Sequence, residues 1–234
     1  MKGLILLLCS YVAVDASLAP FITPCGPSDS SCMKSSAQKA VPIMAAGLPE
    51  LGVKPLDPAV IDLVKADQAG LKLEFRKTTV KGLRNCNVLN VKRQGLKQSI
   101  ELKCSATLVG EYTIGGKLLI LPVEGDGKYK IKIRDIIVKV QYELKEKTAK
   151  GDKYWSLSTW KYTSDLQGGA EFQFQNLFNG NKQLSDTVHQ FANTSWKEIF
   201  EEVAPPIVKA IVAKIIEEVA KFFDKVPIKD LALE

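Results

Sequence analysis

Apolar and polar residues alternate along the middle of the chain, between Leu71 and Leu144. Alternation with a period of two is typical of β-strands that bury one face, because successive side chains point to opposite sides. The pattern therefore predicts an antiparallel sheet with one buried and one solvated face. The inward positions it predicts are Leu73, Phe75, Ile100, Leu102, Cys104, Ala106, Leu108, Tyr129, Ile131, Ile133, Ile136, Val138, Val140, Tyr142 and Leu144.

Glycine-containing segments separate the alternating runs and predict the turns of this sheet. They lie at Gly95, Gly115-Gly116, 125–127, Gly151 and Gly168-Gly169. Connections this short join neighbouring antiparallel strands, so the sheet is expected to be a meander.

Helical patterns flank the predicted sheet. Residues 30–47 are expected to form a helix that begins at Asp29 or Ser30 and contains Pro42, and the proline-rich segment 47–64 is expected to be an ordered loop. A second helical region is expected to open after LFNGN, residues 177–181, with Ser185 or a nearby residue as its cap. The pair Pro205-Pro206 then either kinks one long helix or starts a new one.

The last helical stretch, residues 207–226, has an apolar stripe and a charged side. The stripe consists of Val208, Ile211, Val212, Ile215, Ile216, Val219, Phe222 and Phe223. The charged side consists of Lys214, Glu217, Glu218, Lys221, Asp224 and Lys225. Because a strongly twisted sheet curls, we expect this helix to lie half buried against the dry face of the sheet.

The interior of such an α+β fold has two interpretations. The helix and the sheet can interdigitate to a packed core, or the curvature of the sheet can hold them apart and leave an elongated apolar cavity. The packed core is the simpler interpretation of the pattern, and periodicity alone does not separate the two.

The first sixteen residues predict export. They contain an early lysine, an apolar run from Leu4 to Val14 and small residues suited to cleavage after Ala16, as in a secretory signal peptide. Residues 17–234 are then expected to form one domain, since 46% of the chain is hydrophobic and no linker-like segment interrupts it. The net charge of +6 is spread along the chain, which argues against a nucleic-acid partner.

Export makes the four cysteines that remain after cleavage informative, because oxidising compartments favour disulfides. Cys25 and Cys32 flank a turn-rich loop and are expected to pair. If Gly95 centres a hairpin, Cys86 and Cys104 face each other across two strands and form a second bond; the alternative is two buried thiols. The triplet that begins at Asn193 is an N-glycosylation sequon.

Residues for catalysis or metal binding are poorly represented. His189 is the one histidine, and the sequence frames no serine as a nucleophile that it could activate. We therefore expect neither an enzyme, nor a metal site, nor a cofactor.

Several segments together carry a family resemblance: FITPC with a second cysteine seven residues on, GLPELGVKPLDP, LFNGNKQLSDTVHQFANTSWKEIFEEVAPPI, and KFFDKVP. In this order they resemble the takeout and juvenile hormone binding protein family of insects and related arthropods, over essentially the whole chain after residue 16. The resemblance implies a long C-terminal helix wrapped by a highly curved antiparallel β-sheet, an elongated hydrophobic tunnel as in tubular lipid-binding proteins, and the bond between Cys25 and Cys32. It favours the tunnel over the packed core.

The function that follows is a secreted carrier of a hydrophobic small molecule, such as a juvenile hormone-like isoprenoid, a fatty acid or a semiochemical. We expect a monomer in an extracellular fluid, haemolymph or sensory fluid, with a circadian or chemosensory role as the family's alternatives. The alternative function is a module that binds lipid or membrane surfaces, suggested by Lys128, Lys130 and Lys132. The expected ligand-binding residues are Leu73, Phe75, Ile100, Leu102, Tyr129, Ile131, Ile133, Val138, Val140, Tyr142, Val208, Ile211, Ile215, Val219 and Phe222.

Overall fold

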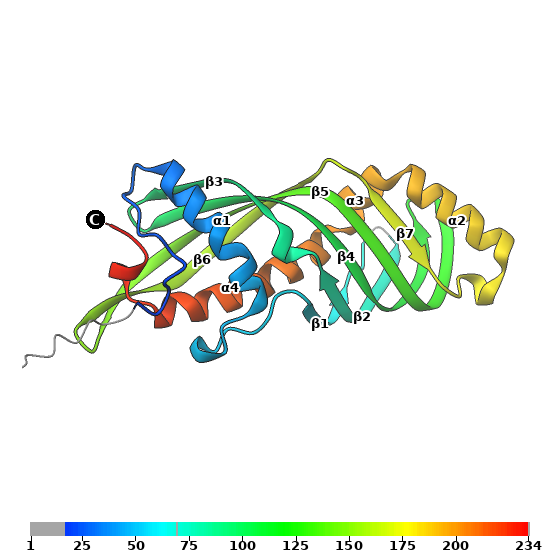
Figure 1. Ribbon diagram of the computed structural model, residues 1–234. Helices are drawn as coiled ribbons and strands as arrows, with labels where there is room; N and C mark the ends of the chain where they lie inside the picture. Colours follow the sequence, from blue (N-terminus) through cyan, green and yellow to red (C-terminus); the bar gives the residue numbers. More distant parts are fainter. Residues whose placement is uncertain (1–16, 69, 234) are drawn as a thin grey trace, which may run out of the picture.

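The computed structural model describes residues 17–68 and 70–233, so the expected signal peptide lies outside the described residues. One antiparallel sheet in the strand order β1-β2-β4-β5-β6 coils along the length of the molecule (Figure 1). Two further strands join it, β3 beside β4 and β7 beside β5. The strands are β1 (Ala59–Lys65), β2 (Leu71–Lys81), β3 (Asn87–Gln94), β4 (Lys97–Leu118), β5 (Leu121–Ala149), β6 (Asp152–Leu166) and β7 (Ala170–Phe174).

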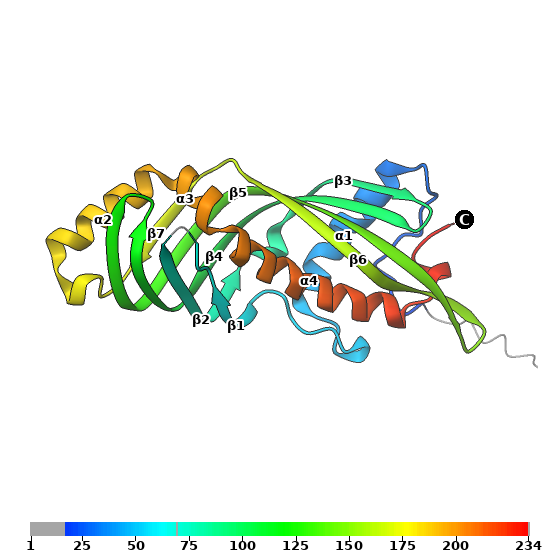
Figure 2. The same ribbon diagram turned by 180° about the vertical axis from the view of Figure 1, so that it is seen from behind.

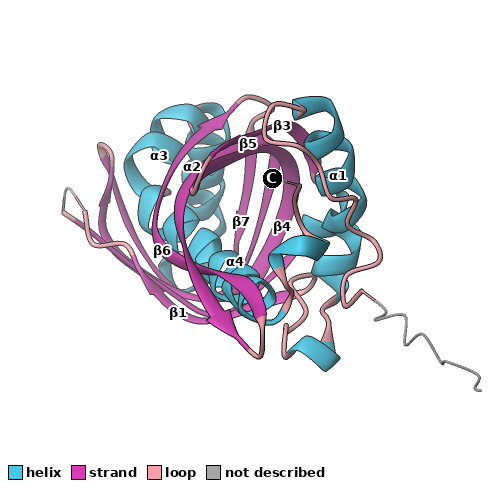
Figure 3. Cartoon of the chain, turned by 90° about the vertical axis from the view of Figure 1, so that its left-hand side faces the viewer, coloured by secondary structure: helices cyan, strands magenta, loops and turns pink. Residues whose placement is uncertain are grey.

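The C-terminal helix α4 lies inside the curl of the sheet and contacts both edge strands, β1 and β6 (Figure 3). The helix therefore closes the gap that the sheet leaves open. Helix α1 packs against β3 near one end of the molecule, and α2 and α3 pack against β7 at the other end (Figure 2). The helices are α1 (Ser30–Ala46), α2 (Lys182–Thr194), α3 (Trp196–Val203) and α4 (Pro205–Lys225), with 3-10 turns η1 (Pro49–Leu51), η2 (Leu83–Asn85), η3 (Phe178–Gly180) and η4 (Ile228–Asp230).

The helix boundaries follow the sequence signals with one exception. The side chain of Asp29 accepts a hydrogen bond from the backbone N–H of Cys32 at 2.9 Å and caps α1, as expected. The double proline starts a new helix, α4. Helix α2 begins directly after LFNGN, as expected, but its cap is Asn181, whose Oδ1 accepts from Leu184 N at 3.2 Å, and not Ser185. Among the described residues, no helix is long and apolar enough to cross a bilayer.

Two of the glycine segments are not turns. Gly116 lies inside β4 and Gly127 inside β5, and only residues 119–120 separate these two long strands. A Cβ atom on Gly116 would lie 2.1 Å from the carbonyl oxygen of Gly70, and one on Gly127 would lie 2.5 Å from that of Gln175. Glycine is present because another backbone passes close by, which is its other role within strands.

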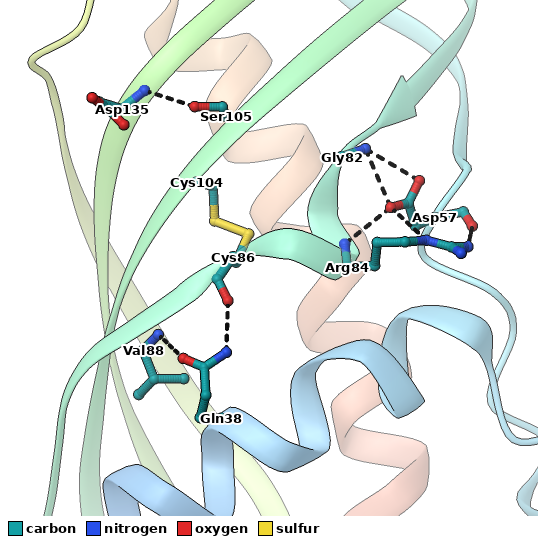
Figure 4. The surroundings of a disulfide bond; sticks show 9 residues. All are labelled: Gln38, Asp57, Gly82, Arg84, Cys86, Val88, Cys104, Ser105 and Asp135. Carbon is teal, nitrogen blue, oxygen red and sulfur yellow. Dashed lines mark hydrogen bonds and ion pairs between the residues drawn. A yellow bond between two sulfur atoms is a disulfide. The ribbon is translucent and has the colours of Figure 1, made fainter.

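Strand β5 changes its inward parity at Asp135. A register shift between β4 and β5 leaves an extra residue here, and Asp135 has a φ of 52° while its N–H donates to Oγ of Ser105 at 3.0 Å (Figure 4). Such a bulge lets Ile133 before it and Ile136 after it face the same side. One continuous strand therefore replaces the two separate alternating runs of the sequence.

Both expected disulfides are present. The first joins Cys25 to Cys32 in α1, with Cα atoms 5.8 Å apart. The second joins Cys86 to Cys104, with Cα atoms 4.4 Å apart (Figure 4). The hairpin turn is centred between Gly95 and Leu96, and a register shift further along β3 restores the opposition of the two cysteines.

Candidate ligand-binding cavity

A cavity of about 390 Å³ lies between α4 and the inner face of the sheet. Its volume falls within the range of small-molecule sites in proteins. The wall follows β5 from Ile131 to Tyr142, which corresponds to roughly 35 Å of strand. The helix and the sheet thus do not interdigitate to a solid core, and the interior is an elongated apolar space.

Fourteen of the fifteen residues expected to contact a ligand line this cavity. The exception is Tyr129, which lies behind the wall: its ring packs on Phe75 with centroids 4.3 Å apart, and its hydroxyl shares a hydrogen bond of 2.7 Å with Oγ1 of Thr78. Burial raises the pKa of Tyr129 to about 12, so the hydroxyl stays neutral. The fourteen are Leu73, Phe75, Ile100, Leu102, Ile131, Ile133, Val138, Val140, Tyr142, Val208, Ile211, Ile215, Val219 and Phe222.

Helix α1 supplies a part of the wall that the sequence reasoning missed. Ala37, Val41 and Met44 line the cavity from one face of this helix. Their spacing of four and three residues is the signal that could have found them. The side-chain amide of Gln38 holds the helix against β3, as Figure 4 shows.

The disulfide between Cys86 and Cys104 is also part of the wall. Asp57, which is 8% exposed, fixes the turn that precedes Cys86 (Figure 4). Its carboxylate accepts from the backbone N–H of Gly82 at 3.2 Å and from the N–H and Nε of Arg84 at 3.0 and 3.1 Å. Three donors on one carboxylate thus hold η2 in place next to Cys86.

Glu218 corrects the expectation that this side of α4 is solvated. Its side chain is fully buried, because the segment after η1 covers it. Oε2 accepts from the backbone N–H of Lys54 at 2.8 Å, and Oε1 accepts from Nζ of Lys221 at 2.8 Å. Burial works to raise the pKa of Glu218, but these two donors outweigh it and the pKa lies below its usual value. Glu218 therefore anchors α4 as a charged carboxylate.

One polar pair lies at the apolar wall: Tyr142 lines the cavity, and Gln98 lies beside it outside the lining. The hydroxyl of Tyr142 donates to Oε1 of Gln98 at 3.1 Å, across paired positions of β4 and β5. Burial raises the pKa of Tyr142, so the hydroxyl remains protonated. Nε2 of Gln98 is buried without a hydrogen-bond partner among the described residues. A buried, unpaired donor of this kind calls for a partner, which water or a ligand oxygen can supply.

The two other residues singled out in the sequence, His189 and Asn193, form hydrogen bonds with the backbone of β7. His189 accepts a hydrogen bond from Phe174 N at 2.9 Å, and Asn193 pairs with the backbone of Phe172. In the part of the chain that the structure describes, no group of three or more histidine, cysteine, aspartate or glutamate residues could hold a metal.

The lysines of the outer face are not equivalent. Lys132 forms an ion pair with Glu171 at 3.1 Å. Lys128 and Lys130 border a shallow outer depression of about 450 Å³ that is separate from the apolar cavity. This depression is lined largely by polar side chains, so it does not extend the hydrophobic site.

Comparison with known proteins identifies relatives along the whole chain. A model of the family described as haemolymph juvenile hormone binding protein matches residues 4–233. The circadian clock-controlled protein daywake of Drosophila melanogaster is 28% identical over 215 residues, which cover 84% of this chain and 82% of that protein. A juvenile hormone-binding protein of Manduca sexta is 28% identical over 88 residues, 36% of this chain and 38% of that protein.

A solved structure shares the fold. The crystal structure of Epiphyas postvittana Takeout 1 is similar with a TM-score of 0.89 and 35% sequence identity. The similarity covers 91% of this chain and 100% of that chain. The curled sheet and the C-terminal helix are therefore arranged as in a takeout protein.

Proposed function

The chain belongs to the takeout and haemolymph juvenile hormone binding protein family, and from this premise we propose that it is a secreted carrier of a hydrophobic small molecule. The observation that carries the proposal is the apolar cavity of about 390 Å³ between α4 and the sheet. The cargo is a long, mostly apolar molecule of the isoprenoid, fatty acid or semiochemical kind.

The energetics of such a cavity suit a carrier. Burial of apolar surface contributes about 25 cal/mol per Å², so a ligand that buries roughly 400 Å² gains about 10 kcal/mol before association costs. Those costs amount to several kcal/mol, which leaves room for micromolar affinity and for release. Chain length then contributes more to affinity than the chemistry of one end.

Export is part of the proposal. The first sixteen residues have the pattern of a signal peptide, and two disulfides suit an oxidising extracellular compartment. We propose that the mature protein begins after Ala16, acts as a monomer and returns its ligand chemically unchanged.

Displacement of a fluorescent hydrophobic probe, combined with native mass spectrometry, tests the carrier function. Ile211→Trp and Val138→Trp would fill the cavity from opposite walls, and we expect each to weaken binding at least tenfold. Lys209→Trp places the same ring on the exposed side of α4 and should leave binding unchanged. Equal binding by all three variants, with unchanged melting temperatures, would contradict the proposal.

A further inference from the structure

Helix α2 takes the place of a neighbouring strand along β7. Strand β7 pairs with β5 on one side. On α2, Oδ1 of Asn193 accepts from Phe172 N at 2.7 Å and Nδ2 donates to Phe172 O at 3.2 Å. One turn earlier, Nε2 of His189 accepts from Phe174 N at 2.9 Å. Two side chains of one helix thus satisfy the free backbone groups of a short edge strand.

The contact with Phe174 fixes the protonation state of the histidine. A backbone N–H can only donate, so Nε2 of His189 must carry no proton and the ring must be neutral. Histidine side chains commonly gain a proton between pH 5 and 8. In the charged ring both nitrogens are donors, and N–H would then face N–H. Asn193 cannot titrate, so protonation would remove one of the two attachments and leave the other.

The attachment lies directly on the wall of the cavity. The side chains of Phe172 and Phe174 line it from β7, and Ala192 and Ile199 line it from α2 and α3. The backbone group that His189 binds therefore belongs to a residue whose ring contacts the cavity space. Loss of this bond would loosen α2 and β7 at that end of the molecule.

We propose that His189 is an acid-sensitive latch, meaning the single hydrogen bond between its Nε2 and Phe174 N that holds α2 on β7. Acidification breaks the latch and opens this end of the cavity, so that ligand leaves faster. The effect on ligand rests on the proposed carrier function, whereas the loosening of α2 does not.

Other charged groups lie on α2 and on the elements packed against it. Some of them form ion pairs with one another. On α2 itself Lys182 pairs with Asp186 at 2.5 Å, and on β7 Glu171 pairs with Lys132 at 3.1 Å and with Arg134 at 3.2 Å. The hydrogen bond from Lys132 holds the pKa of Glu171 below its usual value. Turn η3 has no titratable side chain, and α3 contributes Lys197, Glu198, Glu201 and Glu202. Within the described residues, none of these groups is hydrogen-bonded or ion-paired to His189.

Hydrogen exchange tests the latch without a ligand. His189→Gln is the matched variant, because its Oε1 can accept from Phe174 N and does not titrate. At about pH 7.5 the Phe174 amide should exchange equally in both proteins. At about pH 5 it should exchange about tenfold faster in the wild type, which corresponds to about 1.4 kcal/mol and is typical of one hydrogen bond. Comparison at equal pH cancels the intrinsic dependence of exchange on pH.

His189→Ala covers the case in which glutamine does not reproduce the bond. This variant lacks the acceptor at every pH. The Phe174 amide should therefore exchange more slowly in the wild type than in this variant at pH 7.5, and at the same rate in both proteins at pH 5. If the ratio of the Phe174 exchange rates in the wild type and in His189→Ala stays constant between pH 7.5 and pH 5, the latch is overturned.

Probe release measures the consequence for a ligand. For 1-N-phenylnaphthylamine we expect the dissociation rate of the wild type to rise at least threefold, relative to His189→Gln, between about pH 7.5 and pH 5. If the probe does not bind even at pH 7.5, the carrier function is contradicted, while the exchange ratio still decides the latch. If the dissociation rate rises equally in the wild type and in His189→Gln, the latch is contradicted and the carrier function is not.

Discussion

Gln38 stands beside Cys86 as a substitute for a neighbouring strand. Its Nε2 donates to the carbonyl oxygen of Cys86 at 3.1 Å, and its Oε1 accepts from the N–H of Val88 at 2.7 Å. Asn193 on α2 makes the same kind of two-point contact with β7 at the other end of the molecule. Two helices therefore cover two strand edges with amide side chains, which also protects the edges from pairing with another chain.

Removal of the first amide should destabilise the protein. In Gln38→Ala the carbonyl of Cys86 and the N–H of Val88 lose their partner, and we expect a loss of about 2 kcal/mol in the free energy of unfolding, measured in urea. Lys39→Ala, at an exposed position of the same helix, is the control and should change stability little. Equal midpoints for the two variants would show that water replaces the amide without cost.

The periodicity of the sequence predicted the inner face of the sheet but not its strand lengths. Inward positions on β4 and β5 are correct on both sides of Asp135 because each alternating run was assigned by its own pattern. The inward positions on β5 are odd-numbered up to Ile133 and even-numbered from Ile136, but this change of parity does not show that a bulge at Asp135 joins the two runs into one strand. Gly116 and Gly127 misled for a related reason, since glycine marks a close backbone approach as well as a turn.

The wall of the cavity was predictable where one helix and one sheet face each other, and not where a third element closes it. The stripe on α4 and the inward strand residues could be found from period alone. Tyr129 has the correct parity, yet it does not line the cavity, and its ring packs on that of Phe75, which does. Glu218 sits on the charged side of α4, and only the fold brings Lys54 over it. Contacts between residues this distant in sequence leave no local pattern.

The pair of Tyr142, which lines the cavity, and Gln98 beside it should confer a preference for oxygenated ligands. Nε2 of Gln98 has no partner among the described residues and Tyr142 lines the cavity beside it. We expect the double variant Gln98→Leu with Tyr142→Phe to bind a long-chain methyl ester about tenfold more weakly, the effect of roughly one hydrogen bond. A hydrocarbon of equal length should bind both proteins alike in probe displacement. Parallel losses for ester and hydrocarbon would indicate a packing defect instead.

Glu218 should make stability depend on pH in one direction. Because its pKa is lowered in the folded protein, its contribution is present above the pKa of an unfolded glutamate, about 4.3, and is lost as pH falls through the lower folded value. Glu218→Ala should therefore cost about 1–3 kcal/mol at neutral pH, because Lys54 N–H loses its acceptor.

Measuring the free energy of unfolding of Glu218→Gln and the wild type at several pH values separates the contribution of the negative charge from that of the hydrogen bond to Lys54. Glu218→Gln retains an oxygen for Lys54, so its deficit against the wild type should appear at pH 7 and shrink below about pH 4. Glu201, an exposed glutamate on α3 that forms no ion pair among the described residues, provides the control variant Glu201→Gln. A deficit for Glu218→Gln that does not change with pH would mean that the carboxylate is not the charged anchor inferred here.

The sequon at Asn193 and the contact with β7 compete for the same nitrogen. An N-linked glycan is attached to Nδ2, the atom that donates to Phe172 O at 3.2 Å, and the backbone of β7 occupies that side of the amide. We expect the protein secreted from insect cells to have the mass of the unmodified chain that begins at Ser17. Ser195→Ala removes the sequon and keeps Asn193, so it should leave mass and stability unchanged. Asn193→Ala should lower the free energy of unfolding by about 1–3 kcal/mol. If the secreted wild-type protein carries a mass excess that an N-glycosidase removes, and is fully stable with the glycan attached, then α2 is held on β7 without this amide.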